Sequence, residues 1–374
     1  MARQSLIETI ASLPDPRLHR TRKHHLDDIL MIVLIGLLGG ATSFEGLEAF
    51  ATCREAWLRT FLKLPNGIPS HDTLHRVLCA LDPKAFASRF AAWAAQWMPR
   101  TLPHIAIDGK SLHGSDANTF CGCMHLVSAW ATEQGLLLGQ EAVADLSNES
   151  TAIPPLLAML KLRGALVTID AAGCQKRIAA TIRDQKGHYL LCVKANQPKL
   201  YPAVEAAFAA ALATEFAGLT WSQHASSEAG HGRVEERYVT VIENPPGLPT
   251  DWRDLAAIVQ VNRERSVNGQ NTSTTHYYIS SLAASAETLG RLIRRHWAIE
   301  NELNWSLDVV FGEDANRTQD RNASANLGVL RRLAASLLQR MPGRQSQRVK
   351  MVHAAGSTDY MDRVLSQIPR VLDA

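Results

Sequence analysis

The sequence contains no hydrophobic run long enough to cross a membrane, and it has no internal repeat or low-complexity tract. The longest apolar run, ILMIVLIGLLGGA at residues 29–41, has 13 residues, whereas a spanning helix needs about 20. The amino-terminal residues MARQSLIETIASLPDP lack the continuous apolar core of a cleavable signal peptide. We therefore expect a cytoplasmic protein without a membrane partner, in which residues 29–41 form a buried helix.

Cysteine is also scarce, with six residues scattered among 374. This usage indicates free thiols in a reducing compartment rather than a disulfide framework. Cys121, Cys123 and His125 lie close together, but no second pair of ligands follows at the spacing of a zinc site. We therefore do not expect zinc to bind there.

The chain has little net charge, because 39 Lys and Arg residues face 36 Asp and Glu residues, a formal charge of +3. Net charge alone therefore does not indicate nucleic-acid binding. Positive residues do cluster at residues 17–25, 291–297 and 331–350. Such clusters are usually solvated surfaces, but they are also how a near-neutral protein presents a phosphate-binding surface. The candidates for DNA contact in the first two clusters are Arg20, Arg22, Lys23 and Arg295.

Residues 1–98 are expected to form a helical domain. Ser70 and Asp82 are placed to cap helices, and Pro83 follows at a first helical position. An ordinary helical bundle is the favoured interpretation. The alternative is a DNA-binding helix-turn-helix, whose exposed residues would be His71, Thr73, His75 and Arg76.

Residues 99–374 change to a strand-rich pattern. Three apolar strands come first, then helix and strand alternate; the strand segments are HIAIDGKSL, HLVSAWA, LLLGQEAVA, LVTIDAAG and HYLLCVKAN. This order is typical of an α/β fold with a ribonuclease H-like mixed sheet flanked by helices. In that topology the fourth strand lies beside the first. We therefore predict that Asp108 and Asp170 end neighbouring strands and face each other.

A β-rich insertion is predicted at about residues 215–283, where RVEERYVTVI, LAAIVQVNRERSV and THYYISSL are separated by Pro, Gly and Asn. A long helix is then predicted from about Ser285 to Phe311. The insertion would separate the fifth strand from this helix.

The long helix supplies a third acid. His296, Glu300, Asn304 and Asp308 recur every four residues and would form one polar stripe, with Glu300 opposite the two aspartates. Three neighbouring carboxylates repel one another unless cations are present, and hard oxygen ligands favour Mg²⁺ or Mn²⁺. Two such ions about 3.5 to 4 Å apart suit phosphoryl transfer on DNA.

Each acid also has a simpler explanation. Asp108 with the following Gly109 could form a turn, Asp170 could cap the next helix, and Glu300 could form a surface ion pair with Arg294 or Arg295. Their joint placement favours the catalytic interpretation over these alternatives.

The sequence resembles the DDE transposases of bacterial insertion sequences, in the H-repeat-associated (ISAs) group. The matching segments run nearly end to end: DPRLHRTRKHHLDDILMIVLIGLLGGATSFEGLEAF, IAIDGKSLHGS, HLVSAWA, SNESTAIP, LVTIDAAGCQ, HGRVEER and RHWAIENELNWSLDVVFGEDANR. The resemblance implies that Asp108, Asp170 and Glu300 bind two Mg²⁺ or Mn²⁺ ions in a ribonuclease H fold with a β insertion before the glutamate.

The sequence departs from related transposases around the last acid. Ile293 stands at a tyrosine position, His296 at an arginine position, and Leu307 or Asp308 at a lysine position. Leu146 also stands where the family pattern suggests a lysine, which leaves open whether this copy is active.

The predicted function is that of a transposase that binds its terminal inverted repeats, cleaves DNA and transfers the strand. The alternatives are a metal-dependent nuclease without strand transfer and an inactive, transposase-derived DNA-binding protein. The partners would be element ends and target DNA, in a homodimer or higher assembly at the nucleoid. The further candidates for DNA contact are Lys110, Lys194, Asn196, Gln197, His231, Arg233, His296 and Asn304.

Overall fold

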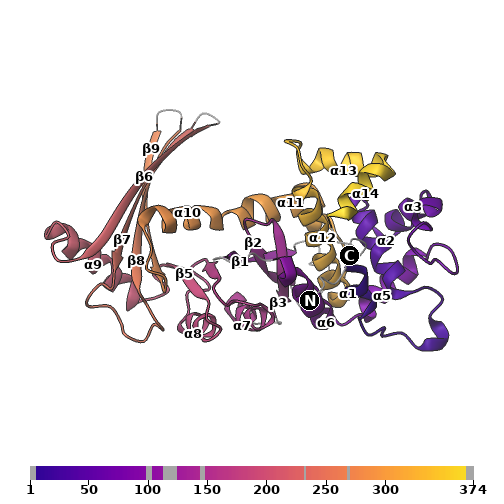
Figure 1. Ribbon diagram of the computed structural model, residues 1–374, viewed down its shortest axis with the longest axis horizontal. Helices are drawn as coiled ribbons and strands as arrows, with labels where there is room; N and C mark the ends of the chain where they lie inside the picture. The colour runs from indigo at the N-terminus through magenta and orange to yellow at the C-terminus, as the bar shows by residue number, and fades with distance from the viewer. Residues whose placement is uncertain are drawn as a thin grey trace. The chain divides into compact units, whose positions relative to one another are not determined.

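The computed structural model describes residues 6–97, 103–112, 124–143, 148–230, 233–267 and 270–367. The chain divides into two compact units (Figure 1). Unit 1 comprises Met1–Met98, Gly109–Leu160 and Ile299–Ala374, and unit 2 comprises Pro99–Asp108 and Lys161–Ala298. The predicted boundary at residue 98 coincides with one division between the units, but unit 1 also takes in two later segments.

Unit 1 is built mainly of helices around one long central helix, α12, and each of these helices buries its apolar face against neighbours. Residues 29–38 of helix α2 are buried without interruption, which confirms the buried helix predicted there. Helix α12 packs against α2, α5 and α6. The helices of unit 1 are α1 Leu6–Ala11, α2 Leu26–Leu38, α3 Phe44–Thr52, α4 Glu55–Leu58, α5 His71–Ala80, α6 Pro83–Ala94, α7 Glu149–Met159, α11 Trp305–Val309, α12 Arg321–Arg340, α13 Gln347–Gly356 and α14 Thr358–Ser366.

Unit 1 also contains an antiparallel strand pair, β2 Met124–Ala131 and β3 Leu136–Ala142. Strand β1, His104–Leu112, lies beside β2 and contributes its last four residues to this unit. Helices α6, α7 and α12 pack against β3. The buried side chains of both strands therefore face helices of the same unit.

Unit 2 contains the rest of the sheet, in the strand order β1-β4-β5-β9-β8-β7-β6. Strand β4, Leu166–Ile169, pairs in parallel with β1 and with β5, His188–Val193. The predicted adjacency of the first and fourth strands is therefore confirmed. Helices α8, Lys176–Asp184, and α9, Leu200–Ala213, follow β4 and β5.

The predicted β insertion forms four antiparallel strands that continue the same sheet (Figure 1). They are β6 Thr220–Gly230, β7 Arg233–Glu243, β8 Ala257–Val267 and β9 Gln270–Ser280. Strand β9 pairs with β5, which joins the insertion to the parallel strands. Helix α10, Ala286–His296, packs on one face of the sheet through Leu289, Leu292 and Ile293.

The single long helix predicted from Ser285 to Phe311 was wrong. Helix α10 ends at His296, a π-helical segment covers Ile299–Asn304, and α11 begins at Trp305. A π-helix closes its hydrogen bonds over five residues rather than four, so residues spaced by four do not keep to one side. The predicted polar stripe of four residues is therefore interrupted at this segment. The division between the two units also falls between His296 and Glu300.

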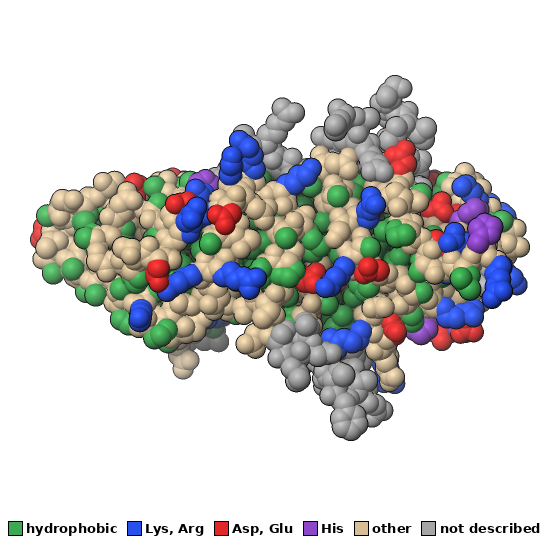
Figure 2. Space-filling model, turned by 90° about the horizontal axis from the view of Figure 1, so that it is seen from below, with side chains coloured by type: hydrophobic (Ala, Val, Ile, Leu, Met, Phe, Trp, Pro, Cys, Tyr) green, Lys and Arg blue, Asp and Glu red, His purple; other side chains and the backbone are tan. Residues whose placement is uncertain are grey.

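Charged side chains of both signs are interspersed on the face of the molecule that Figure 2 shows. On the face shown in Figure 2, Lys and Arg side chains alternate with Asp and Glu and with hydrophobic side chains. This distribution agrees with the small net charge of +3. None of the helices in the described ranges is long and apolar enough to span a membrane.

Candidate active site

Asp108 and Asp170 follow directly on paired residues of neighbouring parallel strands. The last register pair of β1 and β4 is Ile107 with Ile169, and the two aspartates come next on each strand. Both aspartates are half-buried, whereas every residue of β4 is buried. The sheet thus places the two aspartates side by side, where the pairing of the buried strands β1 and β4 ends.

The two aspartates differ in one respect from the prediction, because Asp108 does not end its strand. Strand β1 continues to Leu112, alongside β2, after its pairing with β4 has stopped. The alternative of a turn at Asp108 and Gly109 is therefore wrong. Asp108 lies where β1 exchanges one neighbour for the other.

Asp170 is held by the loop that follows it. Its Oδ1 accepts hydrogen bonds from the backbone N–H groups of Ala172 at 3.0 Å and Gly173 at 3.3 Å. Helix α8 begins only at Lys176, and Gln175 is its N-cap residue. Asp170 therefore shapes its own loop and does not cap the helix, which excludes that alternative.

The loop after β5 braces the loop that carries Asp170. Asn196 Nδ2 donates to the carbonyl oxygen of Ala171 at 2.7 Å, and Gln197 Nε2 donates to that of Cys174 at 2.6 Å. Both amides were predicted as phosphate contacts. The structure gives them a supporting role for the Asp170 loop, and their contact with DNA stays a prediction.

A buried polar network lies beneath the two aspartates. Thr168 Oγ1 is 2.8 Å from Nε2 of His104 and 2.9 Å from Nδ1 of His296. Because side chains alternate along a strand, His104 lies on the same face as Asp108, and Thr168 lies on the same face as Asp170. The network therefore connects β1, β4 and helix α10 directly below the acids.

Both histidines of this network are held neutral. Burial lowers the pKa of His296 to about 4. Burial lowers the pKa of His104 to about 3, and the electrostatic interaction with His296 and the positive charges of Arg295 and Arg291 act in the same direction. His296 therefore packs within unit 2 as a neutral hydrogen-bonding group. The sequence analysis did not identify His104 and Thr168. Their positions, four residues before Asp108 and two before Asp170, would have predicted that they lie on the same face of the sheet as the aspartates.

Glu300 lies in the π-helical segment of unit 1 and is exposed. A surface ion pair of Glu300 with Arg294 or Arg295 was the alternative to a catalytic role. Arg294 forms an ion pair with another residue, because its Nη2 lies 2.8 Å from Oε2 of Glu228 on β6. π-Helical turns are rare and are often found at functional sites, and the segment that carries Glu300 has this conformation.

Gly109, the residue after Asp108, is closely surrounded in unit 1. A Cβ atom at this position would collide with Nε2 of His125 and with the carboxyl group of Glu149. His125 Nε2 lies 3.6 Å from Glu149 Oε2, and its Nδ1 lies 2.9 Å from Ser111 Oγ. Only glycine fits beside His125 and Glu149. The sequence analysis did not identify these two residues as a pair.

Lys110 is an ion-pair residue in unit 1. Its side chain is buried, and Nζ lies 2.7 Å from Asp308 and 2.9 Å from Asp314. Burial acts to lower the pKa of Lys110, but hydrogen bonds to both carboxylates outweigh it, and the pKa is raised. Lys110 was predicted to contact phosphate; the structure pairs it with these two acids, and a contact with phosphate stays a prediction.

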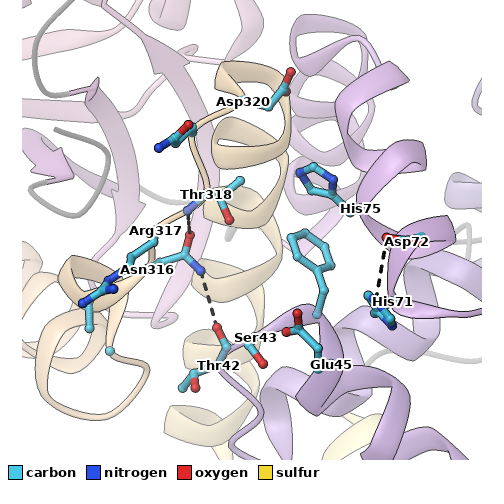
Figure 3. A pocket seen from close by; sticks show the side chains of 14 residues that line it. Thr42, Ser43, Glu45, His71, Asp72, His75, Asn316, Arg317, Thr318 and Asp320 are labelled. Carbon is cyan, nitrogen blue, oxygen red and sulfur yellow. Dashed lines mark hydrogen bonds and ion pairs between the residues drawn. The ribbon is translucent and has the colours of Figure 1, made fainter. Parts of the chain in front are cut away.

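Two of the amino-terminal candidates, His71 and His75, line a cavity of about 650 Å³ in unit 1 (Figure 3). His71 Nδ1 lies 2.6 Å from Glu48, and the ring of His75 packs edge-on against Phe44 at 4.9 Å. The lining also contains the acids Glu45, Asp72 and Asp320, so the cavity has no excess of positive charge. Helices α3 and α5 pack together, and the choice between a bundle and a helix-turn-helix stays a prediction.

The remaining predicted DNA contacts are distributed over both units. Arg20, Lys23, Arg76, Lys194 and Arg233 are exposed. Arg22 pairs with Asp15 at 3.4 Å. His231, Leu146, Cys121 and Cys123 lie outside the described residues. The DNA contacts predicted for the arginines, the lysines and His231 stay predictions.

Comparison with known protein families matches residues 99–338 to "Transposase DDE domain" and residues 7–94 to "DDE_Tnp_1-associated". The chain belongs to the DDE transposase family. "Putative transposase YncI" of Escherichia coli O157:H7 is 37% identical over 98% of this chain and 95% of its own length. "H repeat-associated putative transposase YhhI" of Escherichia coli K12 is 35% identical over 98% and 99%. The resemblance seen in the sequence is thereby confirmed.

One shorter relative and one solved structure are also similar to this chain. "Inactive transposase YbfQ" of Escherichia coli K12 is 35% identical but covers only 21% of this chain. A piggyBac transposase synaptic complex with hairpin DNA matches 99% of this chain and 80% of its own, with 9% identity and a TM-score of 0.40. A score this low supports no inference about the fold.

DDE transposases use divalent metal ions, and the donor atoms beside β1 and β4 fit such ions chemically. Carboxylate oxygens are the hard ligands that Mg²⁺ and Mn²⁺ prefer, and Mg²⁺ is often held by one or two carboxylates together with water and substrate phosphate. Within the described ranges, no three His, Cys, Asp or Glu side chains lie close enough to hold a metal ion by themselves. That the two aspartates are metal ligands therefore stays a prediction, in which they would form a partial ligand set completed by substrate phosphate.

Proposed function

We propose that this DDE transposase binds the terminal inverted repeats of its own element, cleaves the DNA and joins the freed ends to target DNA. The observation that carries the proposal is the placement of Asp108 and Asp170 directly after the register pair Ile107 and Ile169. Glu300, four residues after His296, is the third acid of the proposed triad.

The strand order supports a ribonuclease H-like catalytic fold. Strands β2 and β3 are antiparallel, β1, β4 and β5 are parallel, and β1 lies between β2 and β4. This is the order predicted from the sequence for that fold. In it, the acids on β1 and β4 meet where the two strands diverge.

The proposed reaction has two phosphoryl-transfer steps. A water oxygen attacks the phosphorus at the element end, the bond to the 3′ oxygen breaks, and that oxygen takes a proton to become a 3′ hydroxyl. The 3′ hydroxyl then attacks a phosphorus of the target DNA and displaces another 3′ oxygen. Two bound divalent ions would lower the barrier by activating the nucleophile and stabilising the leaving oxygen.

The residues of the chain divide this work among them. Asp108, Asp170 and Glu300 would ligate the ions through carboxylate oxygens. Asp170 is oriented by the backbone N–H groups of Ala172 and Gly173, and Asn196 braces the same loop. A ligand held in this way keeps its geometry when substrate enters, because its loop has other partners.

The deciding experiment compares wild type with Asp170→Asn on a labelled duplex that carries the element end, first with Mg²⁺ and then with Mn²⁺. Asp184→Asn is the matched control, because Asp184 is an exposed residue at the end of α8. We expect wild type and the control to cleave and join, and Asp170→Asn to bind DNA without cleaving it. Full activity of Asp170→Asn would overturn the proposed triad.

Two other functions are outcomes of the same assay. Cleavage without joining of pre-cut ends would identify a nuclease. Normal binding without cleavage by wild type in either metal would identify an inactive DNA-binding protein. Either result contradicts the proposed transposase activity.

A further inference from the structure

The two faces of the β6–β9 sheet differ in their charged side chains, because one of them carries all the arginines of its described residues. Register pairs place Arg237 opposite Arg263 and Glu235 opposite Arg265, so these side chains share one face with Arg233. We call the face that carries Arg233, Arg237, Arg263 and Arg265 the arginine face. It is also the face on which helix α10 packs, because Val239 and Val261 of this face lie in the same apolar cluster as Leu289.

The other face of the same strands has acidic but no basic side chains. Alternation along the strands assigns Glu236 and Glu264 to it, and these two residues are register partners. Within the described parts of β6 to β9, every Lys or Arg side chain belongs to the arginine face. The arginine face also carries Glu228, Glu235 and Glu243, so only the basic side chains are confined to one face.

The arginine face also has more cations than its own acids neutralise. Arg237 pairs with Glu228 and Glu235, and Arg294 of α10 pairs with Glu228 as well. Among the described residues, no carboxylate pairs with Arg263 or Arg265. Arg263 is moreover directly opposite Arg237, and like charges opposed across strands are destabilising unless an anion lies between them.

The arginine face continues the face of the sheet that carries Asp170. The register pair Ile169 with Leu191 sets Asp170 level with Cys192, and Cys192 pairs with Tyr278 and Tyr278 with Val259. Arg263 lies four residues beyond Val259 on β8. With about 3.4 Å per residue and about 4.8 Å per strand, Arg263 is on the order of 20 Å from Asp170.

A lysine and a histidine lie on the sheet between these two positions. Lys194 follows β5, and His276 precedes Tyr278 by two residues on β9, so both lie on the arginine face. Burial lowers the pKa of His276, and the positive charges of Arg263 and Lys194 lower it further. These three side chains are therefore close enough to interact electrostatically.

We propose that the arginine face binds the phosphodiester backbone of duplex DNA about six base pairs from the bond that is cut. The proposal rests on the proposed function, which places a scissile phosphate beside Asp108 and Asp170. A duplex rises about 3.4 Å per base pair along each strand, so 20 Å corresponds to about six base pairs. Arg263 and Arg265 supply the contacts, with Lys194 between them and the acids.

The test compares Arg263→Gln/Arg265→Gln with Arg177→Gln/Arg253→Gln, a pair that removes the same charge from exposed sites elsewhere in unit 2. Affinity for element-end duplexes is measured at several salt concentrations. The duplexes extend either about two or about twelve base pairs on each side of the cleavage position, and circular dichroism checks that all variants are folded.

We expect the first pair, and not the control pair, to weaken binding of the long duplex about tenfold or more at low salt. The slope of log affinity against log salt should fall by about one for each arginine, while the short duplex is bound equally by all forms. Equal slopes for both pairs on the long duplex would overturn the proposal, and so would a change in the oligomeric state of the first pair alone.

This test separates its own failure from failure of the proposed function. Cleavage of the short duplex by both pairs, with equal slopes on the long one, contradicts the arginine face and leaves the triad intact. A fall in slope for a protein that cleaves neither duplex supports the arginine face and contradicts the transposase activity.

Discussion

Nδ1 of His296 lies 2.9 Å from Oγ1 of Thr168, two residues before Asp170. The contact fastens the end of helix α10 to strand β4 at the level beneath the two aspartates. His104 completes it from β1 at 2.8 Å. One threonine hydroxyl thus holds three elements together, and two of those elements carry proposed ligands.

Replacing Thr168 with Val should destabilise the protein by about 1 to 3 kcal/mol. Val has the same shape, but it leaves the buried ring nitrogens of His104 and His296 without their partner. Urea unfolding measures the loss. Thr168→Ser keeps the hydroxyl and should retain most of the stability; equal stability of the Val variant and wild type would show that the hydrogen bonds contribute nothing.

Acidification should destabilise the protein through His104 and His296. Their folded pKa values are about 3 and about 4, whereas an unfolded histidine titrates near 6.5. Between pH 6.5 and about 4 the unfolded chain binds more protons than the folded chain, so stability falls as pH falls, by up to about 1.4 kcal/mol per pH unit for each histidine.

Urea midpoints measured from pH 7.5 to pH 5 test this dependence. His104→Asn/His296→Asn removes both groups and should flatten the curve over that range. The same steepness in wild type and variant would mean that these histidines are not the source.

Loss of the ion pair between Glu313 and Arg332 should be among the most damaging single changes in unit 1. Oε1 of Glu313 lies 2.8 Å from Nη1 of Arg332, and both side chains are fully buried. Glu313→Ala leaves a buried guanidinium unpaired, which costs about 3 to 5 kcal/mol. Thermal unfolding should show a large fall in Tm.

The exposed pair of Glu55 and Arg59 provides the comparison for that change. Glu55→Ala should alter the free energy of unfolding by no more than about 1 kcal/mol, because water screens both charges. Similar effects of the two substitutions would contradict the structural reading of Glu313.

Gly109→Ala should abolish DNA cleavage while DNA binding persists. The added Cβ collides with His125 and Glu149, and one of these or the strand after Asp108 must move. Overpacking of this kind costs about 1 to 3 kcal/mol. Gly356→Ala is the control, since no atom lies within 4 Å of the Cβ it would add. Cleavage by Gly109→Ala at the wild-type rate would show that the crowding is relieved without moving Asp108.

Asn196→Ala distinguishes a loop brace from a phosphate contact. The structure has Asn196 Nδ2 donating to the carbonyl oxygen of Ala171, next to Asp170. We expect slower cleavage at saturating DNA, with unchanged DNA affinity and unchanged salt dependence. Weakened affinity with a smaller salt slope would instead favour the phosphate contact predicted from the sequence.

The sequence by itself determined the strands and the two aspartates. The apolar runs before Asp108 and Asp170 are short and continuous, and strands buried on both faces require that pattern. The order of three strands followed by alternating helix and strand was enough to predict that β4 lies beside β1, because crossovers between parallel strands allow few topologies.

Only the tertiary structure determined the helical geometry of the segment around Glu300. A spacing of four residues predicts one stripe for any regular helix, and the sequence offers no sign of a π-helical turn at Ile299–Asn304. Hydrogen-bond slippage of this kind depends on packing around the helix rather than on the residues' own preferences. The same is true of His296, whose partner Thr168 is 128 residues away in the chain.

The placement of the arginines on one face of the β6–β9 sheet also depends on tertiary structure. Arg237 and Arg263 are neighbours only because β7 and β8 pair in one register, and a shift of one residue would send one of them to the opposite face. Alternation along a strand is local and can be read from the sequence. The register between strands is set by long-range pairing and by the apolar cluster beneath α10, so only the fold determines which charges share a face.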